Sequence, residues 1–310
     1  MSKEVVHNIK KVLITGSNGL LGQNLIKILR GNPDYQLFAL SRSPNVYPDQ
    51  DGYTFIQLDL TEEAAVNKLA KDILPDVIVH AAAMTQVDPC ELNPADCESI
   101  NVDATRNIAK LAGRCGSHLV YISTDFVFSG ENGPYREEDQ VDPVSIYGES
   151  KLAGERITMK LSVPWSIVRT ILVYGVTPAM SRSNLVLWVK NSLEAGKAIR
   201  VVNDQFRMPT LVDDLANGIG SIIKGQKEGI YHLSGDEYGS VYDFSLRIAR
   251  FFSLDESLIS PISSASLEQA GKRPPDTGFI LDKAEKELNF KPTSFVNGLT
   301  VVQNLLSVYQ

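Results

Sequence analysis

The sequence predicts an α/β fold built on a doubly wound parallel sheet, with a smaller, discontinuous lobe toward the C-terminus. Short runs rich in β-branched and aromatic residues alternate with longer segments of helical apolar spacing in the first half of the chain. A glycine-rich turn joins the first such run to the first helical segment. The chain has 310 residues, which is enough for one large α/β unit with a smaller companion.

The predicted elements alternate in a way that favours crossover connections. Strands are expected over residues 11–15, 36–40, 53–58, 76–80, 117–123 and 165–169, and helices between them over residues 20–30, 62–73, 102–115 and 151–160. Strands that alternate with helices of this length form right-handed βαβ units. Such units build a parallel sheet that is covered on both faces.

A turn between the first strand and the first helix carries the spacing Gly-x-x-Gly-x-x-Gly. Such a turn lets the backbone approach a pyrophosphate, which rests against the helix N-terminus, where free amides and the macrodipole favour negative charge. The alternative is a glycine turn that is only structural. The strand–turn–helix context favours a dinucleotide site of the Rossmann type, formed by Gly16, Asn18, Gly19, Leu20, Leu21 and Gly22.

The end of the second strand bears on the choice between NAD and NADP. An acidic residue there would bind the ribose hydroxyls, but this chain has Ser41 and Arg42, and a guanidinium suits a 2′-phosphate. NADP(H) is therefore favoured and NAD(H) is the alternative. The competing interpretation of Arg42, which this pattern disfavours, is a solvated loop residue. Other cofactor contacts are expected from residues that follow the next two strands, namely Asp59, Leu60, Ala81, Ala82 and Ala83.

The alternation changes after about residue 174. Helices are expected over residues 183–193, 211–223 and 242–252, with short strands over 199–202 and 230–233. We expect residues 1–174 to form the dinucleotide-binding domain. Residues 175–310 are expected to form mainly a substrate-binding lobe, from which some segments return to the main sheet.

Composition excludes several classes of partner. The apolar fraction of 43% and charged fraction of 22% are ordinary for a soluble globular protein. The formal net charge of −7 argues against nucleic acid and anionic membranes, and no apolar run is long enough to span a bilayer. Three cysteines without Cys-x-x-Cys spacing indicate a reduced cytoplasm. The four histidines are scattered without metal-ligand spacing, so no catalytic metal is predicted.

Tyr147 and Lys151 are four residues apart in a helix-compatible run. On an α-helix this spacing places both side chains on one face, where an ammonium favours the phenolate and is expected to lower the pKa of the tyrosine. The pair alone is common on helix surfaces. Its position downstream of the glycine turn and of the polar turn Ser123-Thr124-Asp125 favours a catalytic role.

These motifs together resemble those of extended short-chain dehydrogenase/reductases, and more narrowly those of the dTDP-4-dehydrorhamnose reductase branch. The matching segments are the three glycines, His80 to Asp88, Ile100-Asn101-Val102, Ser123 to Gly130, Tyr147 to Glu155, Asp204-Gln205-Phe206 with Pro209-Thr210, Asp214-Leu215-Ala216 and Arg273-Pro274. The resemblance covers nearly the whole chain.

The resemblance implies reduction of a nucleotide-linked 4-keto sugar by NADPH, with Thr124, Tyr147 and Lys151 as catalytic residues. Thr124 would hydrogen-bond the substrate carbonyl and Tyr147 would protonate the developing alkoxide. Lys151 would tune the tyrosine and bind the nicotinamide ribose, and Asn101 would position the active-site helix or a water near the lysine. A homodimer is compatible with the resemblance.

The substrate side departs from the pattern of the branch, which often has Tyr in place of Phe126 and Gly in place of Arg207. The lead into Tyr147, residues 142–146, is also unusual. The substrate-side candidates are Val87, Thr124, Asp125, Phe126, Arg207 and Arg273. For Val87, Phe126 and the two arginines, packing or surface roles are the alternative.

Two other readings stay open. An epimerase or 4,6-dehydratase of the same superfamily is one, although dehydratases need a glutamate where this chain has Phe126, and epimerases that hold NAD permanently fit Ser41-Arg42 poorly. The other is a cofactor-binding regulatory subunit without turnover, like the methionine adenosyltransferase β subunit. The intact Thr124, Tyr147 and Lys151 disfavour it.

Overall fold

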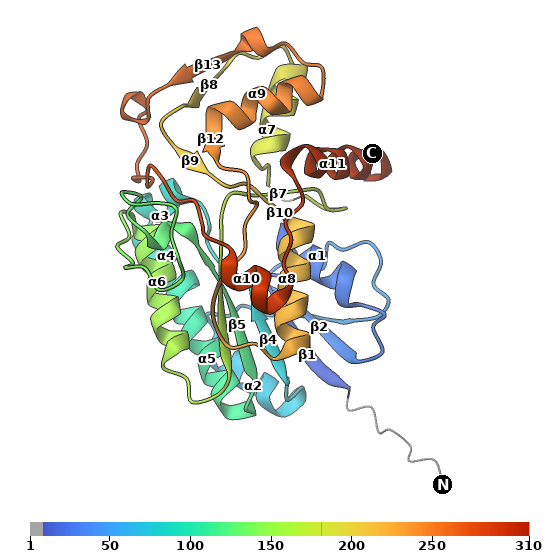
Figure 1. Ribbon diagram of the computed structural model, residues 1–310. Coiled ribbons are helices and arrows are strands. Elements are labelled where there is room, and N and C mark those ends of the chain that lie inside the picture. The colour runs from blue at the N-terminus through green and yellow to red at the C-terminus, as the bar shows by residue number, and fades with distance from the viewer. Residues whose placement is uncertain (1–8, 181, 310) are drawn as a thin grey trace.

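A parallel sheet forms the centre of the molecule (Figure 1). The computed structural model describes residues 9–180 and 182–309, and within them seven parallel strands lie in the order β11-β6-β5-β4-β1-β2-β3. These are β1 Lys10–Thr15, β2 Tyr35–Ser41, β3 Thr54–Gln57, β4 Val77–His80, β5 His118–Thr124, β6 Trp165–Thr170 and β11 Gly229–His232. The predicted fold class is confirmed.

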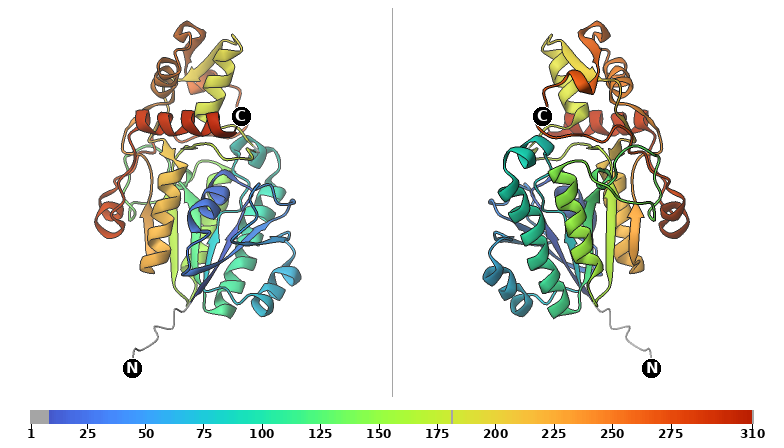
Figure 2. Two further views of the ribbon diagram at one scale, coloured as in Figure 1. Left: turned by 90° about the vertical axis from the view of Figure 1, so that its right-hand side faces the viewer. Right: turned by 90° about the vertical axis from the view of Figure 1, so that its left-hand side faces the viewer.

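The strands are apolar on both sides because helices cover both faces of the sheet (Figure 2). One face carries α1 Leu20–Leu29 and α8 Val212–Gly225, with α10 Asp282–Leu288 beside α8. The other carries α2 Glu63–Asp72, α5 Ala104–Cys115 and α6 Ile146–Met159.

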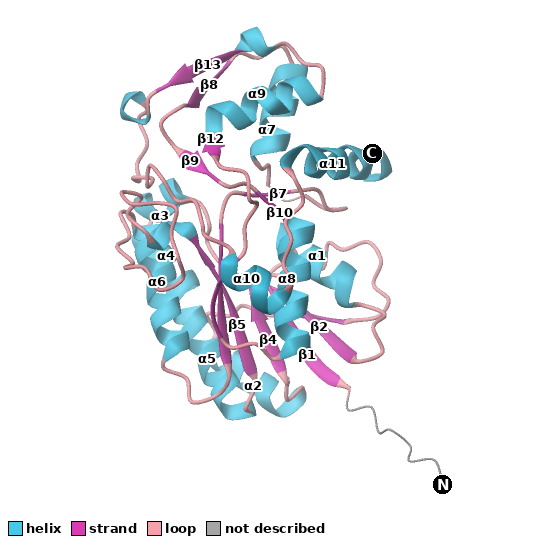
Figure 3. Ribbon diagram, viewed as in Figure 1, coloured by secondary structure: helices cyan, strands magenta, loops and turns pink. Residues whose placement is uncertain are grey.

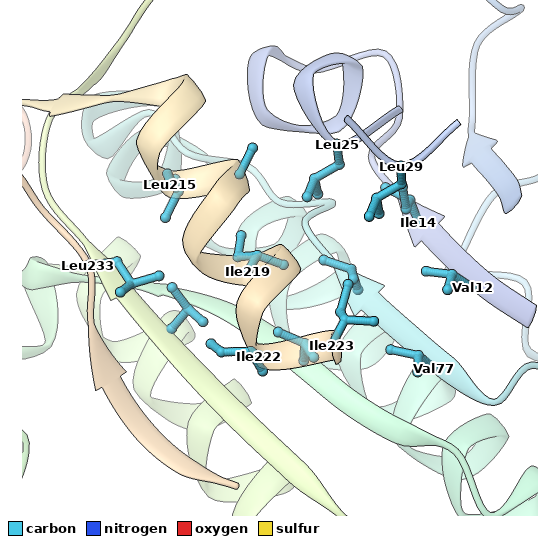
Figure 4. Close-up of a cluster of buried hydrophobic side chains, with 14 of the residues drawn as sticks. Val12, Ile14, Leu25, Leu29, Val77, Leu215, Ile219, Ile222, Ile223 and Leu233 are labelled. Atoms are coloured by element: carbon cyan, nitrogen blue, oxygen red, sulfur yellow. The ribbon is translucent and has the colours of Figure 1, made fainter. Parts of the chain in front are cut away.

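The larger core cluster lies between the sheet and the pair α1 and α8 (Figure 4). Val12 and Ile14 of β1 point into it, whereas Leu13 between them belongs to the cluster on the opposite face, as the period of two in a strand requires. Ile219 and Ile223 of α8 complete the layer from outside, and both are fully buried. A helix from the second half of the chain therefore closes the core of the first half.

A smaller lobe sits beyond the carboxyl ends of the strands (Figures 1 and 3). Its helices are α7 Leu185–Glu194, α9 Val241–Phe251 and α11 Phe295–Tyr309, and they share one core cluster. Its short strands pair two by two: β8 Ile199–Val202 with β13 Ile259–Ile262, β9 Phe206–Arg207 with β12 Gly239–Ser240, and β7 Val173–Tyr174 with β10 Thr210–Leu211.

Several elements differ from the sequence-based expectation. The helix expected over residues 151–160 is continuous with the helix-compatible run that holds Tyr147, and it begins at Ile146, where Ser145 caps it by accepting a hydrogen bond from the amide of Gly148. The helix expected from residue 102 begins at Ala104, after a π-helical turn over Ser99–Asp103. Two short helices, α3 Val87–Leu92 and α4 Pro94–Glu98, were not predicted, and neither were α10 and α11. None of the helices in the described residues combines the length and apolarity that crossing a membrane would require.

Candidate functional site

The glycine turn packs tightly against the segment that follows β4. Gly16 has a φ of +70°, and a Cβ added there would lie 2.7 Å from the backbone nitrogen of Ala82. A Cβ on Gly22 would lie 2.3 Å from the carbonyl oxygen of Gly16. Glycine is therefore required at both positions by space, and at Gly16 also by conformation.

The turn is tied to its surroundings by two amide side chains. Asn18 Nδ2 donates to Ser43 Oγ at 2.9 Å and to the carbonyl of Pro44 at 2.8 Å, in the loop after β2. Gln23 Nε2 donates to the carbonyl of Ala179 at 2.7 Å, in the segment that leads into α7. These contacts fix the turn between the loop after β2 and the smaller lobe.

The turn and its neighbours fit a dinucleotide. Gly19 is the N-cap residue of α1, and no side-chain cap hydrogen bond is made at the start of this helix. The hydroxyl of Ser17 is buried and has no hydrogen-bond partner within the described residues. A helix N-terminus without a side-chain cap and an unpaired buried hydroxyl are groups that a bound phosphate would satisfy.

The remaining predicted cofactor residues lie at or after the carboxyl ends of β1, β2, β3 and β4. Leu20 and Leu21 open α1, and Ser41 ends β2. Arg42 has a 71% exposed side chain with its Nη1 4.0 Å from Asp59 Oδ2, and Asp59 accepts from the amide and hydroxyl of Thr61, which lower its pKa. Leu60 is buried in the core of the α2 and α5 face, and Ala81, Ala82 and Ala83 follow β4 beside Gly16.

Tyr147 lies in the first turn of α6, beside Thr124 at the end of β5. Burial is the largest influence on its pKa and raises it, while a hydrogen bond with Thr124 acts in the opposite direction. The expectation that Lys151 would bring this pKa below its ordinary value is wrong for this structure, because desolvation of the phenolate dominates. The phenol is therefore protonated at neutral pH, as a proton donor must be.

Lys151 is almost entirely buried, at 3% exposure. Its Nζ lies 4.2 Å from the centroid of the Tyr121 ring, an arrangement in which the ring quadrupole attracts an ammonium. Burial lowers the pKa of Lys151 to about 7, and Glu155 opposes this shift. The amine therefore lies close to the balance between its two protonation states at neutral pH.

Asn101 joins three segments behind these residues. It lies in the π-helical turn, where its Oδ1 accepts from the amide of Met84 at 2.7 Å. Its Nδ2 donates to the carbonyl of Met84 at 3.0 Å and to Ser150 Oγ at 2.9 Å. Single π-helical turns are frequent at functional sites, and this one fixes α6 against the segment after β4.

The predicted substrate-side residues form two groups. Val87 and Phe126 pack in the same small cluster as Tyr147, with the Phe126 and Tyr147 ring centroids 5.7 Å apart. The two arginines are engaged by the protein. Arg207 is 3% exposed, donates to the carbonyls of Phe206, Pro274 and Pro275, and has its Nε 3.8 Å from Asp125 Oδ2. Arg273 binds Asp88 through both of its Nη atoms, at 2.7 and 2.8 Å.

Sequence reasoning missed the polar residues that support the site. Glu91 Oε1 accepts from the amide of Ile146 at the start of α6, and Glu155 pairs with Arg169 in the interior. Glu155 could have been found, because residues 147, 151 and 155 follow one helix face. Glu91 could not, because its helix was not predicted. Within the described residues, no group of three or more His, Cys, Asp or Glu could hold a metal.

The family profile described as "RmlD substrate binding domain" matches residues 10–307, which is nearly the whole chain. The chain belongs to this family.

Members of the RmlD family with different names are similar to this chain. The dTDP-4-dehydrorhamnose reductase of Aggregatibacter actinomycetemcomitans is 32% identical over 301 residues, covering 93% of this chain and 97% of that protein. The methionine adenosyltransferase 2 subunit beta of Bos taurus is 32% identical over 261 residues, covering 83% and 76%. The structure of the dTDP-4-dehydrorhamnose reductase of Bacillus anthracis in complex with NADP has a TM-score of 0.84 at 30% identity, covering 96% and 99%. The similarity to dTDP-4-dehydrorhamnose reductases that the motifs indicated is confirmed.

Proposed function

We propose that this chain is an NADPH-dependent reductase of a nucleotide-linked 4-keto sugar, with Tyr147 as the proton donor. The observation that carries the proposal is the proximity of a buried, protonated phenol to Thr124 at the carboxyl end of a central strand, where ligands meet open α/β sheets. Reductases of this name are similar to the chain over nearly its whole length, and one of them is known in complex with NADP.

The residues that would hold the cofactor are those of the glycine turn, and Arg42 would bind a 2′-phosphate. When bound, a nicotinamide nucleotide supplies the hydride. Arg42 is exposed and its nearest carboxylate is 4.0 Å away, so its guanidinium is available to an added anion. NADP(H) is therefore our preferred cofactor, with NAD(H) as the alternative.

The chain's own residues would handle the proton. Thr124 would hydrogen-bond the carbonyl oxygen of the substrate, and Tyr147 would transfer its hydroxyl proton to that oxygen as negative charge develops on it. The ammonium of Lys151 would stabilise the phenolate left behind. Phe126 has no ionisable group and stands where dehydratases of the superfamily need a glutamate for water elimination, which disfavours a dehydratase.

A second candidate is a regulatory subunit without turnover. It is favoured by one observation, the similarity to methionine adenosyltransferase 2 subunit beta at the same identity as to the reductase. It would use the dinucleotide site for binding alone. Against this candidate, the side chains of Thr124, Tyr147 and Lys151 that the reaction would need are all present, and a protein without turnover would not use them.

The decisive experiment mixes purified protein with NADPH and a panel of nucleotide 4-keto sugars and follows the absorbance of the reduced nicotinamide. Consumption is expected with at least one sugar, and product formation without net consumption would indicate an epimerase. The matched variant Tyr147→Phe should keep NADPH binding and lose at least about a hundredfold in kcat. Binding of NADPH with no consumption in any mixture, together with a change in activity of an added methionine adenosyltransferase catalytic subunit, would favour the regulatory candidate.

A further inference from the structure

Glu155 is a fully buried carboxylate with a complete set of partners. Arg169 of β6 donates to both of its oxygens, from Nε at 2.9 Å and from Nη2 at 2.8 Å. Ser123 of β5 donates its hydroxyl to Oε1 at 2.6 Å. Neither Glu155 nor Arg169 is more than 2% exposed.

A buried ion pair of this kind is weak evidence for stability, because the cost of removing both charges from water offsets much of their attraction. An apolar pair of the same volume would hold α6 against the sheet about as well. The position of the pair indicates another role. Glu155 follows Lys151 by four residues on the same face of α6, and Ser123, to which it is bonded, directly precedes Thr124.

The titratable groups that face Lys151 come from several of the elements packed around it. β4 contributes His80, which burial keeps neutral by lowering its pKa to about 3. α4 contributes the Cys97 thiol, β5 the Tyr121 ring, and α6 the phenol of Tyr147 and the carboxylate of Glu155. Of the groups that oppose the effect of burial on Lys151, Glu155 is the largest.

We propose that Glu155 is a positioning residue for the reaction, a role that rests on the proposed function. Its carboxylate fastens the helix that carries Tyr147 and Lys151 to the strand that carries Thr124, and it raises the fraction of Lys151 that is in the ammonium form. Because Lys151 lies near its protonation balance at neutral pH, removing one nearby negative charge changes the ammonium fraction severalfold.

The test compares charge with shape. Glu155→Gln keeps the shape and removes the charge, and Glu155→Asp keeps the charge and shortens the side chain. Loss of the charge should move the alkaline limb of the pH profile of kcat/KM at least about one unit lower, and kcat/KM at pH 7 should fall about fivefold. Glu155→Asp should lose thermal stability and keep the limb in its wild-type position. Ser123→Ala, which alters no charge, should also keep it.

Substitution of Arg169 should shift the alkaline limb in the opposite direction. This variant also provides a test if Glu155→Gln does not fold. Arg169→Met leaves the carboxylate without its cation, so the alkaline limb should move to higher pH, whereas Arg169→Lys should leave it nearly unchanged. If the limb stays in its wild-type position in Glu155→Gln and Arg169→Met while only melting temperatures fall, Glu155 is merely structural and the inference is wrong.

A second readout does not depend on turnover. The side-chain carbon signal of Lys151, assigned by its loss in Lys151→Arg, can be titrated by NMR in selectively labelled protein. Its midpoint should fall in Glu155→Gln and rise in Arg169→Met. A wild-type protein that turns over no keto sugar would overturn the proposed function, and the lysine titration would still decide whether Glu155 controls the charge of Lys151.

Discussion

At the scale of single residues, burial governs the protonation of the groups around the site. His80 shows this most clearly. Thr105 donates its hydroxyl to the carbonyl of Asn101, so its oxygen accepts from His80 Nε2, and Nδ1 accepts from Thr15 at 2.8 Å. The neutral imidazole with its proton on Nε2 satisfies every partner, and a charged ring would place a second proton where the Thr15 hydroxyl already donates.

This arrangement predicts an acid-sensitive contribution to stability. The folded pKa of His80 is lowered to about 3 from 6.5, so the unfolded chain binds more protons between these values. Stability should therefore fall as pH drops below 6.5, by about 1.4 kcal/mol per pH unit from this residue. Urea unfolding of wild type and His80→Gln at several pH values checks it. If the free energy of unfolding depends on pH with the same slope in His80→Gln as in wild type, the prediction is wrong. A decrease in the free energy of unfolding that is the same at every pH would reflect only lost packing.

Gly16 allows a matched comparison of strain and space. Gly16→Ala combines a positive φ with a contact of 2.7 Å to the Ala82 backbone, whereas Gly31 has a φ of +79° and nothing within 4 Å of an added Cβ. Gly31→Ala should cost about 1 kcal/mol from conformation alone. Gly16→Ala should cost at least about twice as much and should weaken NADPH binding at least tenfold. Equal losses in denaturant unfolding, with binding intact in both, would show that the turn can relax.

At the scale of elements, the start of α6 decides where Tyr147 lies. Two acceptors hold this start: Ser145 Oγ receives the amide of Gly148 at 3.2 Å, and Glu91 Oε1 receives that of Ile146 at 2.8 Å. Both oxygens accept from backbone amides at the start of the helix, which have no hydrogen-bond partner within the helix itself. The cap therefore bears on the site directly, and not only on helix stability.

Two serine caps separate these effects. Ser145→Ala at α6 and Ser240→Ala at α9 remove the same kind of bond, so each should cost about 1 kcal/mol and lower the melting temperature by roughly 2 °C. Only Ser145→Ala should also lower kcat, by roughly three- to tenfold, because Tyr147 lies in the first turn it holds. Steady-state kinetics and thermal unfolding of both variants are the measurements. A similar loss of kcat in Ser240→Ala would place the effect in general stability.

The order of elements was largely predictable because the pattern of apolar residues carries it. Strands β1, β2, β4 and β5 were predicted to within about two residues, since each is a short apolar run bounded by polar residues. The short helices α3 and α4 were not, because six and five residues are too few for a helical period to emerge. Tertiary contacts hold them, such as the ion pair between Asp88 and Arg273.

The parts of the candidate site that are formed by residues close in sequence could be predicted. The parts that depend on contacts between distant segments could not. The glycine turn and the spacing of Tyr147 and Lys151 are local, and the structure places these residues at the carboxyl edge of the sheet. The direction of the Tyr147 pKa was mispredicted, because the degree of burial depends on α3 and on Phe126, which spacing along one helix does not reveal. The commitment of Arg207 to backbone carbonyls was hidden for the same reason.

At the scale of the whole molecule, the chain returns to the sheet with α8 and β11 part-way through building the smaller lobe, and then goes back to add α9 and α11 to that lobe. Side chains of α8 pack beside those of α1 in the core on one face of the sheet, and β11 pairs with β6 to form one edge of the sheet (Figure 4). Arg207 and Asp125 join the two regions again beside Thr124. Segments from both halves of the sequence thus hold the edge of the sheet that carries the candidate site.

This interweaving predicts that residues 1–174 do not fold alone. Leu215, Ile219, Ile222 and Ile223 of α8 are fully buried, and burying such side chains contributes about 1.5–3 kcal/mol each. Losing all four would remove roughly 6–12 kcal/mol, which is comparable to the whole stability of an ordinary domain. The fragment would also leave β6 as an unpaired edge, a feature that promotes aggregation. Circular dichroism and dye binding on the purified fragment should therefore report an unfolded or aggregated chain, whereas cooperative unfolding would mean that the sheet is autonomous and that α8 only covers it.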